Sequence, residues 1–229
     1  MVGKKKTKVS SGNKLALGLA AAATIGTSAI VIKNLPYFVG EYVVSVIDGD
    51  SFKISHDQTI RLASLNAPEM GYCYGQQAKE ALKKLIDGKR VVLRQPQTDR
   101  YGRIMALVYV DRVFVNGYMI KNGFAASTRQ AGFESDTVTA ANEYAREHKI
   151  GIFSSLCTQT DPPDPKCPVK GNIDDRSKAK EYLTPACPDY SKTIIERHFQ
   201  EQWFCSEAAA RAAGFTKSTS CLRKGSNNP

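Results

Sequence analysis

The sequence of 229 residues predicts a β-rich α+β protein: a five-stranded barrel with helices, a small C-terminal α+β module and an N-terminal hydrophobic helix. Five short runs of β-branched and aromatic residues, separated by turn residues, predict the barrel strands. Apolar residues at helical spacing lie between and after those runs. Six cysteines and a proline cluster indicate a separate module stabilised by disulfides. A chain of this length can hold one large core and one smaller unit.

The N-terminal segment, residues 1–33, is predicted to direct the chain to a membrane. Five lysines between positions 4 and 14 precede an uncharged run over residues 15–32, which Lys33 closes. The run is at the short limit for a membrane-spanning helix, and Thr27-Ser28-Ala29 offers a small-residue cleavage site. It is either an uncleaved transmembrane anchor or a cleaved signal peptide, with a buried helix of a soluble protein as a third alternative. Both leading interpretations place the rest of the chain outside the cytoplasm, membrane-anchored or secreted.

The net charge of +10 comes mostly from this segment. Residues 1–40 hold six lysines and no acidic residue, whereas residues 41–156 and 157–229 each carry an excess of only two basic residues. A nucleic-acid-binding face must therefore arise from local clustering rather than from the global charge. The candidates for such a face are Lys83, Lys84, Lys89, Arg90 and Arg94.

The barrel strands are predicted from their β-branched and aromatic residues and from the turns between them. An Asp48-Gly49-Asp50 turn joins the first two strands, and Arg103 stands directly before the last. Pro68 stops strand pairing, so that Glu69 lies on a loop. Five strands with interposed helices are typical of a small barrel. The predicted strands are two within residues 43–54, then 59–65, 90–95 and 104–110.

Three predicted helices accompany the barrel and one belongs to the module. Their apolar spacing supports them, with Gly123 and Gly214 as C-terminal stops and Ser206 as an N-cap. The predicted helices span residues 76–86, 115–122, 137–148 and 206–213.

A proline-rich linker, residues 161–166, separates the barrel from the module, residues 167–224. An even number of cysteines in an exported protein usually means disulfides, and a core this small favours them. Metal binding is the alternative, although the sequence has no C-x-x-C pair. Six cysteines allow fifteen pairings, so their connectivity stays open. The cysteines are Cys73, Cys157, Cys167, Cys187, Cys205 and Cys221.

Three charged residues of the barrel segment suit phosphodiester cleavage: Arg61, Glu69 and Arg103. Guanidinium groups grip phosphate oxygens through two donors and stay charged at any working pH. A carboxylate can accept a proton from water. The Asp48-Gly49-Asp50 turn offers oxygen ligands for a hard cation, which would neutralise developing negative charge.

A resemblance to a known family is carried by the segments VVSVIDGDSFKI, IRLASLNAPE, YGQQAKEALKKLI, TDRYGRIMALVYV and VNGYMIKNGFA. In their order and approximate spacing they resemble the staphylococcal nuclease (thermonuclease-like) family, and the resembling domain spans residues 41–156. The resemblance implies an OB-type barrel and a Ca²⁺-dependent endonuclease, a hydrolase that acts on DNA and RNA. Mg²⁺ and Mn²⁺ are alternative cofactors.

The same resemblance assigns roles to individual residues. It makes Asp50 a calcium ligand, and it places Asn66 where the family usually has a second aspartate and Ala67 where a backbone carbonyl is used. Because an amide oxygen brings no charge, weaker calcium binding is expected. The residues that it implies to be catalytic are Arg61, Glu69 and Arg103.

Four other residues are candidates around the site. Asp48 either forms a hydrogen bond within its turn or holds metal-bound water. Tyr101 either packs under the substrate phosphate or contacts it. Lys83 and Arg90 are candidates for substrate binding.

The C-terminal module has resemblances of its own. It resembles a small cysteine-containing module that follows thermonuclease domains in some bacterial proteins, and Leu183 stands where that module usually has histidine. It also resembles, distantly, the metal-binding module of methyl-transferring DNA-repair proteins.

The sequence therefore predicts an exported, monomeric, calcium-dependent nuclease with little sequence preference, since no element for reading base edges is evident. One alternative is a non-catalytic nucleic-acid-binding OB module, which needs only stacking aromatics and a basic groove. Another is an envelope interaction protein that acts through its C-terminal module. The full set of two arginines, a glutamate and an acidic turn favours the enzyme.

Overall fold

The computed structural model describes residues 40–128, 133, 136–174 and 177–222. Five strands form a closed barrel in the order β3-β2-β1-β5-β6, which a parallel pairing of β3 with β6 closes, and β7 extends the sheet beside β6. This confirms the predicted barrel, and the closed arrangement fits an OB-type fold. The strands are β1 (Glu41–Val46), β2 (Ser51–Ile54), β3 (Thr59–Leu62), β5 (Arg90–Thr98), β6 (Ile104–Val110) and β7 (Val113–Phe114).

The predicted hydrophobic helix over residues 15–32 lies outside the described residues. Within the described ranges, no helix has the length and apolar character needed to cross a membrane.

The third strand is shorter than predicted. It ends at Leu62, and Ser64 follows with a left-handed backbone (φ 60°) that turns the chain. The next residues form a separate strand, β4 (Leu65–Asn66), which pairs antiparallel with β8 (Ala126–Ser127). The break redirects the chain, so Asn66 leaves the barrel sheet and reaches the end where the candidate site lies.

The fourth strand is longer than predicted. The sequence predicts that it ends before Pro96, but β5 continues to Thr98. Its register against β6 shifts between Arg94 and Gln97. A bulge at this point takes Pro96 out of the regular ladder, where its missing N–H would break a hydrogen bond.

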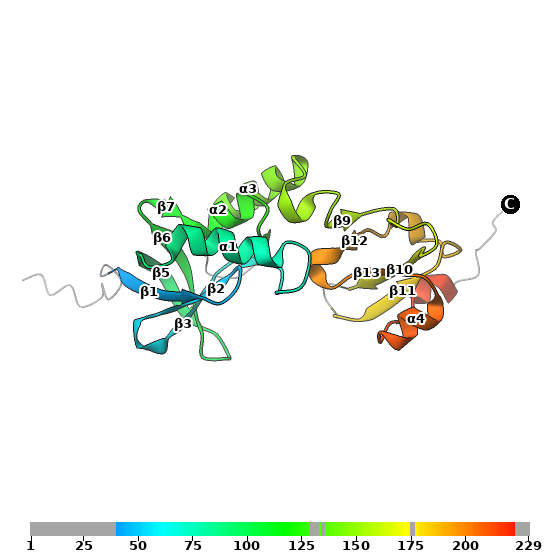
Figure 1. Cartoon of the computed structure of the whole chain (residues 1–229), viewed down its shortest axis with the longest axis horizontal. Coiled ribbons are helices and arrows are strands. Elements are labelled where there is room, and N and C mark those ends of the chain that lie inside the picture. The colour runs from blue at the N-terminus through cyan, green and yellow to red at the C-terminus, as the bar shows by residue number, and fades with distance from the viewer. Residues whose placement is uncertain (1–39, 129–132, 134–135, 175–176, 223–229) are drawn as a thin grey trace, which may run out of the picture. The chain divides into compact units, whose positions relative to one another are not determined.

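Three α-helices lie beside the barrel strands (Figure 1), as the sequence predicts. They are α1 (Gly75–Ile86), α2 (Val115–Lys121) and α3 (Asp136–Glu147). The buried core joins apolar side chains of the strands to α1 and α2, among them Phe52, Leu82 and Met119. Asn116 of α2 is fully buried, and its amide donates to the carbonyls of Ala63 and Ala106 and accepts from the N–H of Val108. This side chain ties α2 to the seam where β3 meets β6.

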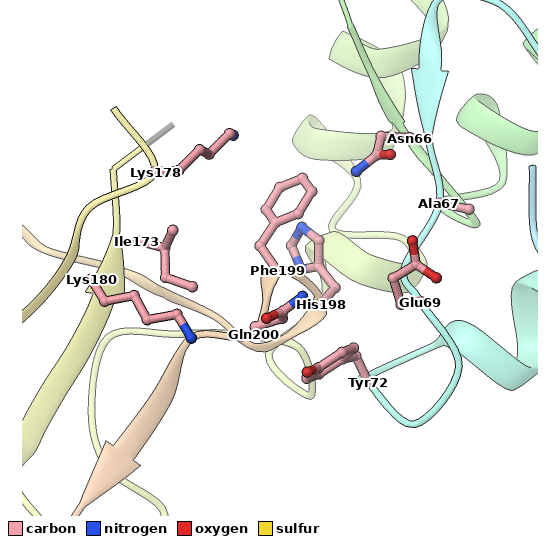
Figure 2. Close-up of a pocket in the computed structure, with 10 residues that line it drawn as sticks. All are labelled: Asn66, Ala67, Glu69, Tyr72, Ile173, Lys178, Lys180, His198, Phe199 and Gln200. Carbon is pink, nitrogen blue, oxygen red and sulfur yellow. The ribbon is translucent and has the colours of Figure 1, made fainter. Parts of the chain in front are cut away.

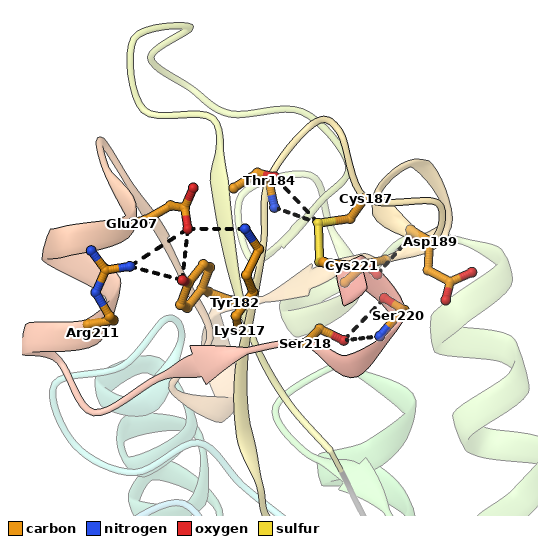
Figure 3. The surroundings of a disulfide bond; sticks show 11 residues. Tyr182, Thr184, Cys187, Asp189, Glu207, Arg211, Lys217, Ser218, Ser220 and Cys221 are labelled. Carbon is orange, nitrogen blue, oxygen red and sulfur yellow. Dashed lines mark hydrogen bonds and ion pairs between the residues drawn. A yellow bond between two sulfur atoms is a disulfide. The ribbon is translucent and has the colours of Figure 1, made fainter. Parts of the chain in front are cut away.

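The C-terminal module holds a four-stranded sheet in the order β13-β10-β11-β14 and one α-helix, α4 (Glu207–Ala212). As predicted, Ser206 caps this helix, accepting a hydrogen bond from the N–H of Ala209 at 3.1 Å. Tyr182 anchors α4 to the sheet, because its hydroxyl donates to Glu207 at 2.8 Å (Figure 3). The strands are β10 (Val169–Ile173), β11 (Lys180–Leu183), β13 (Gln202–Phe204) and β14 (Thr216–Lys217).

All six cysteines form disulfides, which confirms the predicted mode of stabilisation. Cys73 pairs with Cys157, Cys167 with Cys205, and Cys187 with Cys221. The last two bonds lie within the module, and Figure 3 shows the surroundings of the third. With every thiol used in this way, no cysteine is available as a metal ligand.

A short two-stranded sheet connects the module to the barrel region. Its strands are β9 (Thr158–Gln159) and β12 (Ile195–Glu196), which pair antiparallel. Directly after β12, the 3-10 turn η4 (Arg197–Phe199) brings Phe199 against a cluster that includes Tyr74 and Phe153. The other 3-10 turns are η1 (Ser55–Asp57), η2 (Gly151–Phe153), η3 (Tyr190–Lys192) and η5 (Thr219–Leu222).

Candidate active site

The turn between β1 and β2 presents two aspartates at one end of the barrel. Asp48 Oδ1 accepts a hydrogen bond from the N–H of Asp50 at 2.9 Å. A Cβ on Gly49 would lie 2.6 Å from the Cβ of Ala78 and 2.7 Å from that of Ala67, so only glycine fits. The turn is therefore pressed against α1 and the loop of Ala67. Asp48 thus forms the hydrogen bond within its turn, and its other expected role, holding metal-bound water, stays a prediction.

Asp50 is almost completely buried, with 3% of its surface exposed. Its Oδ1 accepts from the hydroxyl of Ser51 at 2.8 Å and forms an ion pair with Arg61, and its Oδ2 accepts from the N–H of Ala67 at 3.1 Å. Burial raises the pKa of this carboxyl to about 6; the Arg61 guanidinium opposes that rise, and Asp48 adds to it. Its negative charge near neutral pH is therefore supported by Arg61.

Arg61, on β3, joins two of the predicted metal ligands. One terminal nitrogen contacts Asp50, and the other donates to Asn66 Oδ1 at 2.8 Å. The planar guanidinium suits such bridging because its donors form a rigid fork. The structure thus gathers three predicted site residues at one point, and 18% of the Arg61 side chain stays accessible.

Glu69 lies on the loop after Pro68, as predicted, at the edge of a pocket of about 320 Å³. The loop is held against the start of α1: Tyr72 N–H donates to the Glu69 carbonyl at 3.1 Å, and a Cβ on Gly75 would lie 2.2 Å from that carbonyl. Asn66 and Ala67 line the same pocket, and Figure 2 shows these residues facing side chains of the C-terminal module. The lining residues are Asn66, Ala67, Glu69, Tyr72, Ile173, Lys178, Lys180, His198, Phe199 and Gln200.

Arg103 is held by the carboxylate of Asp99, a residue that the sequence does not predict to be part of the site. Asp99 Oδ1 accepts from the N–H groups of Tyr101 at 2.8 Å and Arg103 at 2.9 Å, and its Oδ2 accepts from Arg103 Nε at 2.8 Å. Partial burial raises the pKa of Asp99, but the hydrogen bonds and charge of Arg103 outweigh burial and hold that pKa below its ordinary value. Aspartate at the start of a turn often accepts such backbone bonds, which is the sequence signal that could have identified it.

The two arginines expected to be catalytic lie on or directly before neighbouring strands. In the parallel pairing of β3 with β6, Arg61 stands opposite Met105. Arg103 directly precedes β6, two positions before Met105.

Three candidates for substrate binding lie away from the pocket. Tyr101 is 67% exposed, with the guanidiniums of Arg100 and Arg103 4.8 and 5.3 Å from its ring centre. Lys83 forms an ion pair with Asp87 at the end of α1, and Arg90 donates to the Gly40 carbonyl at 2.9 Å. Tyr101 thus lies beside Arg103, whereas Lys83 and Arg90 do not line the pocket of Glu69.

The predicted metal ligands offer the hard oxygens that Ca²⁺ prefers. They are the Asp50 carboxylate, the Asn66 amide oxygen and the Ala67 carbonyl, so the set contains one charge. The described residues hold no group of three or more histidines, cysteines, aspartates and glutamates placed to bind a metal. By chemistry these oxygens suit a weak calcium site, but Arg61 contacts Asp50 Oδ1 and donates to Asn66 Oδ1, so a calcium ion there would share both oxygens with the guanidinium.

Comparison with known proteins identifies the family. Residues 59–155 match the family model of staphylococcal nuclease homologues. The chain is 36% identical over 116 residues to an uncharacterized endonuclease of Escherichia coli, covering 49% of this chain and 75% of that protein. It is 31% identical over 152 residues to a micrococcal nuclease of Shigella flexneri, covering 59% of this chain and 87% of the relative.

The chain belongs to the staphylococcal nuclease family. Family membership makes it a nuclease, a hydrolase of phosphodiester bonds. The match to the family model ends at residue 155, so the module beyond it lies outside the family domain. Six of the ten residues that line the pocket around Glu69 of this nuclease thus lie beyond the segment that matches the family.

Proposed function

We propose that this protein is a calcium-dependent nuclease that hydrolyses DNA and RNA with little sequence specificity. The supporting observation is the cluster of the buried Asp50 with the partly exposed Arg61 and Asn66, of which Asn66 lines the pocket that contains Glu69. It gathers phosphate-binding donors, a candidate base and metal-binding oxygens at one end of the barrel. A module that only binds nucleic acid has no use for this combination.

The two arginines stabilise the negative charge that develops in an in-line displacement at phosphorus. Charge in the transition state is greatest on the phosphate oxygens, so donors positioned there lower the barrier more than they strengthen substrate binding. Arg61 is held by Asp50 and Asn66, and Arg103 by Asp99, so both guanidiniums are positioned before substrate arrives. Glu69 accepts a proton from the attacking water or positions that water.

The Asp50 carboxylate, the Asn66 amide oxygen and the Ala67 carbonyl would hold calcium, which would supply positive charge against the negative charge that develops on phosphate. With one charged ligand, the affinity lies in the weak part of the range for calcium sites, roughly 0.1 to 1 mM. Mg²⁺ or Mn²⁺ are the alternatives that an oxygen donor set allows.

The proposed organisation follows the sequence: residues 1–33 as anchor or signal, 41–156 as the nuclease domain, 161–166 as linker and 167–224 as the module. We place the domain and module outside the cytoplasm. The lysine-rich start and the three disulfides support this, because disulfides persist in oxidising compartments.

One assay tests the proposed activity. Purified protein is incubated with single-stranded DNA or with RNA, each with Ca²⁺, Mg²⁺, Mn²⁺ or a chelator. Cleavage of both polymers with Ca²⁺, and none with chelator, is expected. Binding without cleavage under every metal condition would instead identify the non-catalytic OB module.

A further inference from the structure

The pocket around Glu69 has a second wall that lies outside the nuclease domain. Figure 2 shows Asn66, Ala67 and Glu69 on one side, with Lys178 and Lys180 across from them. The lysines belong to the C-terminal module, well beyond residue 155 where the family match ends. The catalytic pocket is therefore built from two parts of the chain that are distant in sequence.

Several contacts hold this wall in place. The pairing of β9 with β12 fixes the segment before η4, and Arg197 N–H donates to the Cys157 carbonyl at 2.8 Å. Phe199 packs against the cluster of Tyr74 and Phe153, next to the barrel helices. Trp203 Nε1 also donates to the side-chain oxygen of Gln159 at 2.8 Å. Apolar packing and hydrogen bonds of both backbone and side chains therefore hold this wall of the pocket beside Glu69.

Among the described residues, the lysines of this wall have no carboxylate partner. Lys178 and Lys180 are exposed, and within the described ranges neither forms an ion pair. The Lys180 ammonium lies 5.7 Å from the centre of the Phe215 ring, an uncharged neighbour, whereas Lys83 is paired with Asp87. Two ammonium groups without a described ion pair, across a pocket from the proposed catalytic centre, attract an anion.

A second hollow of about 370 Å³ continues from the first, because Tyr72, Lys180 and Gln200 line both. Arg197 adds another cation to it. Its carboxylate, Glu201, is 5% exposed and accepts hydrogen bonds from Asn172 and from the N–H groups of Ile173 and Glu196. The Glu201 charge is thus offset by donors within the module.

We propose that the C-terminal module binds the polynucleotide strand beside the scissile phosphate. Lys178 and Lys180 contact backbone phosphates of a single strand that runs from the pocket of Glu69 into the second hollow. Tyr72, 39% exposed between the two hollows, offers a face on which a base stacks. The proposal rests on the nuclease function proposed above. It makes the module a part of the substrate site instead of an independent binding unit.

Binding measured without catalysis tests the contacts. The full chain, in chelator, is titrated into a fluorescent 12-nucleotide single strand at several salt concentrations. The double variant Lys178→Ala/Lys180→Ala should bind about tenfold more weakly, and its salt slope should fall by about 1.4, since each phosphate contact on a single strand contributes about 0.7. Lys192→Ala, which removes an exposed module lysine outside both hollows, should change neither quantity.

A second substrate separates this proposal from the proposed function. Wild-type protein with Ca²⁺ is assayed on the 12-mer and on a 4-nitrophenyl phosphodiester of thymidine, which is too short to span both hollows. The fold-decrease in kcat/KM caused by the double variant should be at least five times larger on the 12-mer than on the small ester. Wild-type protein inactive on both substrates would refute the nuclease function itself. An active wild type with equal 12-mer binding, salt slope and kcat/KM in the double variant would overturn the substrate role of the module.

Discussion

Each of the two arginines proposed to be catalytic is positioned by its own carboxylate. Arg61 contacts the buried Asp50, and Arg103 contacts Asp99, which also holds the backbone of its loop. A long side chain loses considerable rotamer freedom when it is ordered, about 2 kcal/mol for arginine. Because the carboxylates order the guanidiniums before substrate binds, less side-chain conformational entropy is lost on binding.

The residues proposed to be catalytic should affect turnover more than binding. Arg61→Ala, Arg103→Ala and Glu69→Gln should each lower kcat by roughly 10² or more, with smaller changes in KM, because their interactions strengthen in the transition state. Arg61→Lys and Arg103→Lys should restore little, since an ammonium lacks the two-pronged fork. Steady-state kinetics on single-stranded DNA measures both constants.

A matched control for these variants is Arg112→Ala, which removes an exposed arginine from the turn after β6. It should retain the wild-type kcat. Near-wild-type kcat in all three folded site variants would show that the catalytic assignment is wrong.

Asn66 sets the strength of the proposed calcium site. Asn66→Asp adds a second charged ligand, so the Ca²⁺ concentration for half-maximal activity should fall several-fold below roughly 0.1 to 1 mM. The measurement is a calcium titration of nuclease activity, with calorimetry as a check that does not depend on turnover. An unchanged titration in both assays would place Asn66 outside the metal site.

Asp99 should act through Arg103 and the loop that carries it. Asp99→Ala removes every bond that its side chain accepts and should lower kcat about tenfold by freeing the guanidinium. Asp99→Asn keeps an acceptor for the backbone N–H groups and should recover part of that loss. Equal losses in both variants would mean that the ion pair, and not the loop geometry, positions Arg103.

The sequence predicts the individual site residues unequally. Local sequence patterns predict roles for three residues: Arg61, Glu69 and Asp50. The structure brings Asp50 and Arg61 into contact. Lys178 and Lys180 have no such pattern, because their nearness to Glu69 depends on the pairing of β9 with β12. Long-range pairing of two-residue strands leaves almost no trace in local composition.

At the scale of elements, the barrel was the more predictable part. The barrel strands have clear runs of β-branched residues. In contrast, β10 contains Lys170 and Gly171, and its sequence does not predict a strand. Lys170 is 1% exposed, and its ammonium donates to the carbonyls of Tyr190 and Thr193. Tertiary contacts therefore override the local pattern there, as they often do for β-structure.

The turn η4 buries a histidine that should make stability depend on pH. His198 is 2% exposed, and within the described part of the chain neither ring nitrogen has a hydrogen-bond partner. Burial lowers the pKa of this ring to about 4, and the charge of Arg146 also lowers it. The unfolded chain binds the proton near pH 6.5, so protonation favours unfolding as pH falls from about 6.5 to about 4.

The variant His198→Phe should weaken this acid sensitivity. Between pH 6.5 and 4 its free energy of unfolding should fall less steeply than that of the wild type, by up to about 1.4 kcal/mol per pH unit. Urea unfolding at half-unit pH intervals measures the difference. Identical pH profiles for the two proteins would show that His198 is protonated equally in the folded and unfolded chains.

At the scale of the whole molecule, disulfides replace part of the core that the module lacks. Its main buried cluster contains five residues: Val169, Tyr182, Phe204, Ala210 and Phe215. The Cys187–Cys221 bond spans 34 positions of sequence, and closing a loop of that length restricts the unfolded chain by roughly 3 to 4 kcal/mol.

Cys187→Ser/Cys221→Ser should therefore unfold the module at a lower temperature than the wild type. Calorimetry should show that transition separating from the barrel's, while the Cys73–Cys157 bond stays intact. Cleavage of a 12-mer should weaken above the lower transition if the module contributes to the substrate site. A single unshifted transition would show that the bond contributes nothing to stability.

The Cys73–Cys157 bond also has a consequence for the order in which the chain is completed. Cys73 follows Tyr72 at the edge of the second hollow, and Cys157 precedes β9, on which the module is built. The two cysteines are 84 positions apart, so during synthesis the first must wait for most of the nuclease domain to be made before its partner exists. A reducing cytoplasm would keep both as thiols. Under the export proposed above, a newly made chain in the cytoplasm would lack the covalent link between the loop of Tyr72 and the segment before β9, and would gain it only after leaving the compartment that holds the cell's own DNA.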